Sequence, residues 1–150
     1  MDAIAAAVGA ILETDEEIKR VFVEPPESVT DYPAALVLEI NGETAREGYG
    51  GLWEAEVKIR VWLLAVPRRH LPVAVKAARP WVPRLLGLFQ RHDMLAATEG
   101  DEELGEITGL AWTLGNLAYA KIDHAGVELI ITARVDQQVL LTCGKVALTP

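Results

Sequence analysis

The chain has 150 residues, 51% of them hydrophobic, and a net charge of −8. This length fits one domain with its own core, and the apolar content excludes intrinsic disorder. The acidic balance argues against a general nucleic-acid binder. The single cysteine, Cys143, excludes a disulfide framework and a zinc site made of several cysteines.

The N-terminal apolar run predicts a helix over residues 2–13, with Asp2 as its N-cap. Its apolar side chains recur at helical spacing: Ile4, Val8, Ile11 and Leu12. Thr14 and Glu17 match a capping box, which predicts one further helical turn. No basic segment precedes the run, so we expect no signal peptide, and no stretch predicts a transmembrane segment.

Residues 21–23 predict a short strand, and residues 35–40 predict a buried one. Between them, three prolines hold the chain extended and irregular: Pro25, Pro26 and Pro33. Asn41-Gly42 is a strong turn signal, and we expect a polar, glycine-rich loop over residues 42–52.

The clearest pattern in the chain is the alternation over residues 53–63. It predicts a strand with one apolar face and one charged face. The expected core-facing residues are Trp53, Ala55, Val57, Ile59, Val61 and Leu63. Trp62 is the one large apolar residue on the charged face, so we expect another element or a neighbouring subunit to cover it.

Residues 71–91 predict helical structure. They carry an apolar stripe of Leu71, Ala74, Ala78, Trp81, Leu85 and Leu88. Pro80 and Pro83 do not suit a continuous helix, so we expect a kink, or two helices meeting near Arg79 with Pro80 at the start of the second. The basic residues of this region lie off the stripe and are expected to be exposed.

The C-terminal third predicts an acidic loop over residues 93–106 and a turn at Asp123 to Gly126. Three strands are expected, at residues 106–110, 112–122 and 127–135, the last with clear alternation. We expect residues 137–150 to be an extended arm or a last strand.

The order helix, strands, helix, strands lacks regular βα alternation and so predicts an α+β fold. We expect a mostly antiparallel central sheet, flanked by the N-terminal helix and a kinked central helix. A single domain over residues 1–136 would precede the C-terminal arm.

No catalytic, cofactor-binding or metal-binding constellation is visible in the sequence, so we expect no enzyme activity and no cofactor. The glycines at positions 48, 50 and 51 precede a strand instead of a helix, which excludes a dinucleotide fingerprint and a P-loop. Ser28 lacks the context of a catalytic nucleophile. His70, His92 and His124 lack the spacing of metal ligands, which favours surface or capping roles.

The charge is unevenly distributed: acids dominate residues 1–31 and 93–106, and a basic run lies between them. The basic run is either a solvated helix face, a contact with an acidic patch of a neighbouring subunit, or a contact with phosphates. The candidates for a subunit interface are Arg68, Arg69, Lys76, Arg84, Arg91, Glu102, Glu103 and Trp62.

Three segments after the N-terminal helix carry a resemblance to a known family. They are Tyr-Pro-Ala-Ala-Leu-Val-Leu at 32–38, Trp-Glu-Ala-Glu-Val-Lys-Ile-Arg-Val-Trp-Leu at 53–63, and Gly-Val-Glu-Leu-Ile-Ile-Thr-Ala-Arg-Val at 126–135, with helical residues 71–91 before the last. In this order, residues 2–136 resemble the tail terminator and tail-completion proteins of long-tailed bacteriophages.

The resemblance implies a structural virion protein without catalytic residues. Copies of the chain would form a homohexameric ring that caps the tail tube and joins it to the head connector. Its partners would be itself, the tail tube protein and the connector protein, with DNA only passing through an acidic lumen. Assembly would take place in the host cytoplasm, away from any membrane.

Two other functions stay open at this point. One is a soluble, non-viral α+β module that binds a peptide or small ligand, which a deep and mostly apolar pocket would favour. The other is an enzyme that uses buried carboxylates, which would need two strongly perturbed acids in a cleft.

Overall fold

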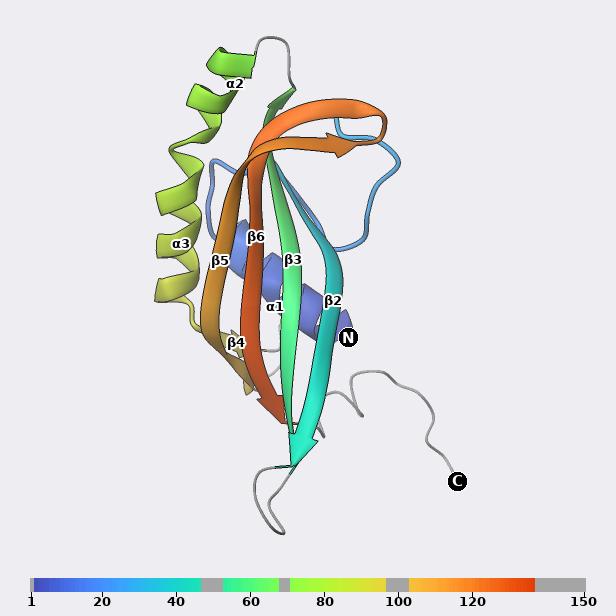
Figure 1. The fold of residues 1–150 in the computed structure, drawn as a ribbon, viewed down its shortest axis with the longest axis vertical. Helices are drawn as coiled ribbons and strands as arrows, with labels where there is room; N and C mark the ends of the chain where they lie inside the picture. Colours follow the sequence, from blue (N-terminus) through green and yellow to red (C-terminus); the bar gives the residue numbers. More distant parts are fainter. Residues whose placement is uncertain (1, 47–52, 68–70, 97–102, 137–150) are drawn as a thin grey trace.

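A computed structural model describes residues 2–46, 53–67, 71–96 and 103–136. In these residues the chain forms an α+β fold of three helices and a six-stranded sheet (Figure 1), so the predicted fold class is confirmed. The helices are α1 (Asp2–Glu13), α2 (Leu71–Ala78) and α3 (Trp81–Arg91). The strands are β1 (Arg20–Phe22), β2 (Ala34–Arg46), β3 (Trp53–Pro67), β4 (Met94–Ala96), β5 (Glu103–Tyr119) and β6 (Ile122–Asp136).

The strands lie in the order β1-β2-β3-β6-β5-β4. Among the described strands, only β1 and β2 pair in parallel, and the other four neighbouring pairs are antiparallel. The short outer strands, β1 and β4, pair with only a few residues of the long strands beside them. Strand β1 pairs with β2 from Ala34 to Leu36, and β4 pairs with β5 from Glu103 to Glu106.

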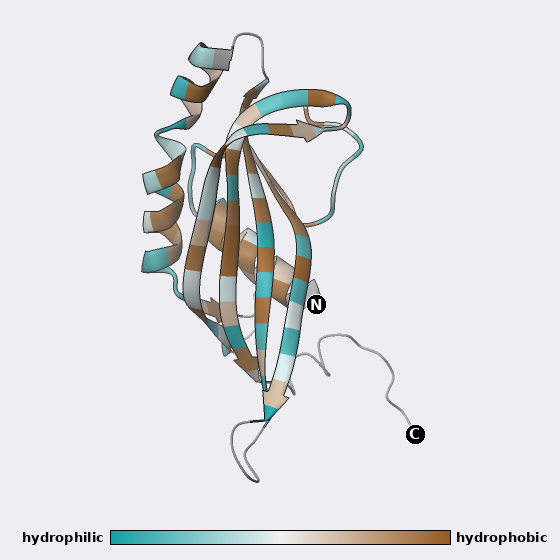
Figure 2. Ribbon diagram, viewed as in Figure 1, coloured by the Kyte–Doolittle hydropathy of each residue, from teal (hydrophilic) through white to brown (hydrophobic). Residues whose placement is uncertain are grey.

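The main core lies between the sheet and the three helices, which all pack on one face. Alternate residues of the central strands supply its floor, among them Ile59, Leu129 and Ile131, each fully buried. Figure 2 shows the corresponding alternation of hydropathy along β3. We call this side of the sheet the helix-covered face and the other side the open face. The expected burial along β3 is confirmed except for Trp53, which lies at the strand end and is 46% exposed.

The proline-rich helical region forms two helices, α2 and α3, that are separated at Arg79 and Pro80. Proline lacks a backbone N–H and therefore starts a helix more readily than it continues one. Pro80 is the N-cap of α3, which confirms the predicted break. The buried side of α3 follows the predicted stripe, and its contributors are Trp81, Val82, Leu85, Leu88 and Phe89.

A second, smaller core covers one end of the open face. Its buried residues are Val29, Ala34, Leu36, Leu64 and Leu117, and we call it the minor core. It forms because the irregular segment 23–33 lies against the sheet beneath the bent β5–β6 hairpin (Figure 1). The hydroxyl of Tyr119 donates a hydrogen bond to the carbonyl of Pro26 and joins the hairpin to this segment.

Three local predictions are wrong, and sheet pairing explains each of them. Asn41 and Gly42 lie inside β2 because residues on both sides of them pair with β3, and only residues 47–52 of the expected loop lie outside the described residues. The two ends of the expected acidic loop form β4 and the start of β5, and residues 97–102 of it lie outside the described residues. Strand β5 is one continuous strand. The turn lies at Ala120 and Lys121, whose φ angles of 53° and 65° suit a tight hairpin.

Gly126 was part of the misplaced turn, and the structure explains the glycine at this position differently. It lies in β6, where an added Cβ would collide with the carbonyl oxygen of Leu63 on the neighbouring strand. A glycine therefore permits the close approach of the two backbones. The predicted arm at 137–150 lies outside the described residues.

The predicted capping box at Thr14 is also wrong. The Thr14 hydroxyl donates to the carbonyl of Ile11 at 2.6 Å, so it satisfies the C-terminal end of α1 instead of starting a new turn. Within the part of the chain that the structure describes, every helix is too short to cross a lipid bilayer.

Candidate functional site

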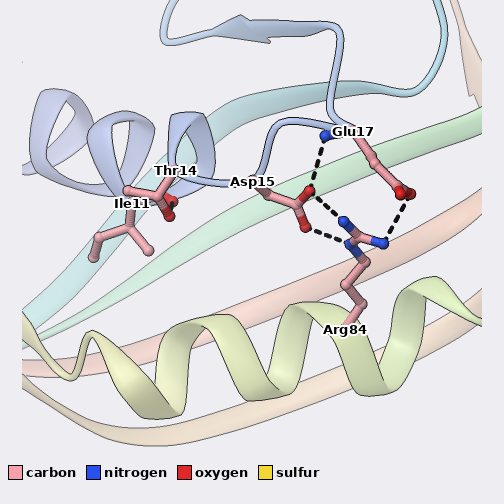
Figure 3. A network of polar contacts seen from close by, with 5 residues as sticks. All are labelled: Ile11, Thr14, Asp15, Glu17 and Arg84. Carbon is pink, nitrogen blue, oxygen red and sulfur yellow. Dashed lines mark hydrogen bonds and ion pairs between the residues drawn. The ribbon is translucent and has the colours of Figure 1, made fainter.

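The best-defined polar cluster joins the end of α1 to α3. The guanidinium of Arg84 donates from Nε and Nη2 to the two carboxylate oxygens of Asp15, at 2.5 and 2.7 Å, and from Nη1 to Glu17 at 2.8 Å (Figure 3). The backbone N–H of Glu17 also donates to Asp15 at 3.0 Å. The planar fork of arginine suits this two-point contact with a carboxylate.

Asp15 is 8% exposed, and burial and the neighbouring charge of Arg84 shift the pKa of its carboxyl in opposite directions. The hydrogen bonds from Arg84 hold the pKa of this carboxyl below its ordinary value, although burial alone would raise it. Asp15 is therefore ionised at neutral pH and already paired, which suits a structural contact better than proton transfer.

An open hollow of about 480 Å³ lies beside this cluster. It is lined by Thr14, Asp15, Glu16, Glu17, Pro83, Arg84, Leu88, Arg91 and His92. Its charged groups largely neutralise one another, and apolar walls are few. Small-molecule sites are typically enclosed and mostly apolar, so this hollow gives little support to the ligand-binding alternative.

The open face carries an excess of acids beyond the minor core. The cross-strand pairing brings together Glu39, Glu43, Glu54, Glu56, Glu106 and Glu128 with only Lys58, Arg60 and Arg134. Arg60 lies 3.5 Å from Glu39 and 3.8 Å from Glu128, and Arg134 lies 3.8 Å from Glu54. The pairs are at least partly exposed, so they contribute little stability, and the surplus of carboxylates defines the electrostatics of this face.

The residues predicted for a subunit interface occupy different environments. Lys76 and Arg91 lie exposed on α2 and α3, and Glu103 lies exposed at the start of β5. Arg84 is bound by acids of its own chain, a pairing that no local sequence signal indicates because Asp15 lies 69 positions away. The remaining charged candidates, Arg68, Arg69 and Glu102, lie outside the described residues.

Trp62, the exception to the alternation of β3, packs against the minor core of its own chain. Its indole N–H donates to the carboxylate of Glu128 at 2.8 Å. Another element of the chain therefore covers the part of this side chain that is buried, which was one of the two expected arrangements.

His124 was expected at the surface and is instead 1% exposed within β6. Its Nε2 lies 2.9 Å from the hydroxyl of Tyr32, and its Nδ1 lies 3.4 Å from the carbonyl oxygen of Leu117. Burial is the main cause that lowers the pKa of His124, so the imidazole is neutral at pH 7. The Tyr32 hydroxyl also lies 3.0 Å from the carbonyl oxygen of Val29. This cluster fastens segment 23–33 to the β5–β6 hairpin.

Among the described residues, no group of three or more histidine, cysteine or acidic side chains is placed to hold a metal ion. Comparison of the sequence with known protein families and with curated proteins finds no match in either.

Proposed function

We propose that this protein is a tail terminator of a long-tailed bacteriophage, a structural virion protein that forms a homohexameric ring. The ring caps the tail tube and joins it to the head connector. The observation that carries the proposal is the acidic open face, which is a broad sheet surface that no described helix covers.

A ring that passes DNA needs a lumen that does not hold the phosphate backbone. Carboxylates repel phosphates, so the open face suits such a lining, whereas a basic face would retain DNA. The helix-covered face would then lie on the outside of the ring. Lys76 and Arg91, exposed on that side, stay candidates for contacts with the tube, the connector or a neighbouring copy.

Sedimentation velocity over a range of protein and salt concentrations tests the assembly. We expect a discrete ring species at high concentration and, in electron micrographs of tails, density from this protein at the end of the tail tube. A strict monomer at every concentration, together with tube ends that lack the protein, would contradict the proposal.

The lumen assignment has its own test. The double variant Glu43→Lys/Glu56→Lys reverses two charges on the open face, and we expect its rings to retain double-stranded DNA in a gel-shift assay at low salt. The matched control, Glu13→Lys/Glu16→Lys, makes the same net change at exposed residues near the end of α1. Equal DNA retention by the two variants would show that the open face does not line the lumen.

A further inference from the structure

The margin of the sheet formed by β5 lacks protection against pairing with another chain. The last contact on the outer side of β5 is the hydrogen bond from the Ile107 N–H to the carbonyl of Asp93, at 2.7 Å. From Thr108 onward β5 pairs only with β6 among the described residues. The sequence from Ile107 to Ala120 contains no charged residue. Monomeric proteins usually guard an open strand edge with charges, prolines or a covering element. We call residues 108–115 the β5 edge.

The exposure of the β5 edge indicates that neighbouring helices do not replace such protection. Helices α2 and α3 run along this side of the molecule (Figure 1), yet Ala111, Trp112 and Thr113 are all exposed. Trp112 has half of its surface in contact with solvent. An exposed tryptophan on a strand with an uncharged outer edge marks a surface that a protein partner covers.

A second open edge lies on the opposite margin of the same sheet. Within the described residues, β2 pairs only with β3 beyond Leu36, where its pairing with β1 ends. Tracing the pairings across the sheet places Val37 level with Trp112 and Gly42 level with Ile107. The uncovered parts of the two margins thus overlap along the same stretch of the sheet. We call residues 37–46 the β2 edge.

The direction of the strands permits these edges to join in a closed ring. Because β2, β3, β6 and β5 are antiparallel in succession, β2 and β5 run in opposite directions. If the ring axis lies roughly parallel to the strands, rotation about it leaves each strand pointing in the same direction in every copy. The β5 edge of one copy would therefore meet the β2 edge of the next as an antiparallel pair, the more stable arrangement.

Charge favours this pairing over contact between two β2 edges. On the open face the β2 edge carries Glu39 and Glu43, whereas Arg46 lies on the other face, opposite Trp53. Two such edges would therefore bring like charges together on the open face. The β5 edge carries no charged residue, so it does not repel these glutamates. Pairing between two β5 edges would give a closed dimer and leave both β2 edges open.

We propose that the β5 edge binds the β2 edge of a second copy of this chain, so that the sheets of neighbouring subunits are continuous around the assembly. This inference rests on the proposed ring and names the surfaces that build it. Backbone N–H and C=O groups of the two edges supply the hydrogen bonds, and the contact buries Trp112.

Cysteine cross-linking tests the pairing in the full chain with Cys143→Ala as background. Ala111→Cys is combined in turn with Glu39→Cys, Asn41→Cys and Glu43→Cys, exposed positions on one face of β2 that cover a range of registers. We expect at least one double variant to form disulfide-linked multimers larger than the dimer, and the Glu39, Asn41 and Glu43 single variants to form none. A covalent dimer from Ala111→Cys alone would identify a β5–β5 contact and overturn the proposal.

A charge variant gives a second, independent measurement. Ala111→Glu places a carboxylate on the same face of the joined sheet as Glu39 and Glu43 of the neighbouring copy, and we expect the association constant to fall by about tenfold or more. Ala77→Glu makes the same substitution at an exposed site on α2 and is expected to assemble like the parent. Equal association of the two variants would contradict the inference.

These outcomes distinguish the two proposals. Ring formation without any cross-link between the edges would overturn the edge pairing and leave the proposed tail terminator function standing. A chain that stays monomeric at all concentrations, forms no cross-links and is missing from tube ends would overturn both.

Discussion

The helix-covered face and the open face are made by alternate residues of the same strands, yet they differ in what covers them. Three helices cover the first, whereas among the described residues only segment 23–33 covers the second, at one end. The helix-covered face therefore holds most of the buried apolar surface and, with it, most of the stability of the fold. The open face is free to vary its charge without loss of the core, which is what a functional surface requires.

The largest expected effect comes from a change in the main core. Ile59→Ala removes a fully buried side chain from the centre of β3, and we expect a loss of about 3 kcal/mol or more in the free energy of unfolding. Lys58→Ala alters the adjacent residue on the open face and should change it by less than about 0.5 kcal/mol. Chemical denaturation measures both. Similar losses in the two variants would mean that the helix-covered face does not contribute more to the stability of the fold than the open face.

The contact between Asp15 and Arg84 should give a smaller effect on the helix-covered side. Asp15→Asn removes the buried carboxylate that binds Arg84 and leaves only the exposed Glu17 as its charged partner, and we expect a loss of about 1–2 kcal/mol. Because the pKa of Asp15 is lowered, its contribution is fully present above the ordinary pKa of aspartate and disappears as the pH falls through the folded-state pKa.

Acid unfolding of the wild type and of Asp15→Asn measures the contribution of the Asp15 carboxylate to stability. The difference in stability between wild type and Asp15→Asn should be largest at neutral pH and should shrink in strongly acidic solution. Glu16→Gln changes an exposed neighbouring acid and serves as the control. A difference that is independent of pH would contradict the ionic role of Asp15.

The sequence predicts local features better than contacts between distant residues, and the reason is physical. Alternation along β3 and the proline at position 80 are local signals, and neither depends on knowledge of distant residues. The turn signal at Asn41-Gly42 fails because antiparallel pairing with β3 outweighs the local preference. The pairing of Asp15 with Arg84 joins residues 69 positions apart and has no local signature.

The minor core allows a test of what holds segment 23–33 on the open face. Tyr32→Phe removes the hydroxyl that contacts Val29 and His124, and we expect a loss of about 1 kcal/mol in the free energy of unfolding. Ser28→Ala changes an exposed residue of the same segment and should be near neutral. If Tyr32→Phe were equally neutral, packing alone would hold the segment in place.

The smallest expected effect is a pH dependence that arises on the open face alone. Burial lowers the pKa of His124, so the unfolded chain binds a proton near pH 6 that the folded chain does not. Stability is then complete above the ordinary histidine pKa of about 6.5 and decreases as the pH falls from there toward the folded-state pKa.

The window from pH 7.5 to pH 5.5 separates the titration of His124 from that of Asp15, because the pKa of Asp15 is lowered and its titration lies at more acidic pH. Wild type should unfold more easily at pH 5.5 than at pH 7.5, and His124→Gln should lose most of this difference even though its overall stability is lower. His92→Gln changes an exposed histidine and should retain the wild-type dependence. Retention of the full dependence in His124→Gln would place its origin elsewhere and would remove the reason to treat the minor core as the acid-sensitive part of the fold.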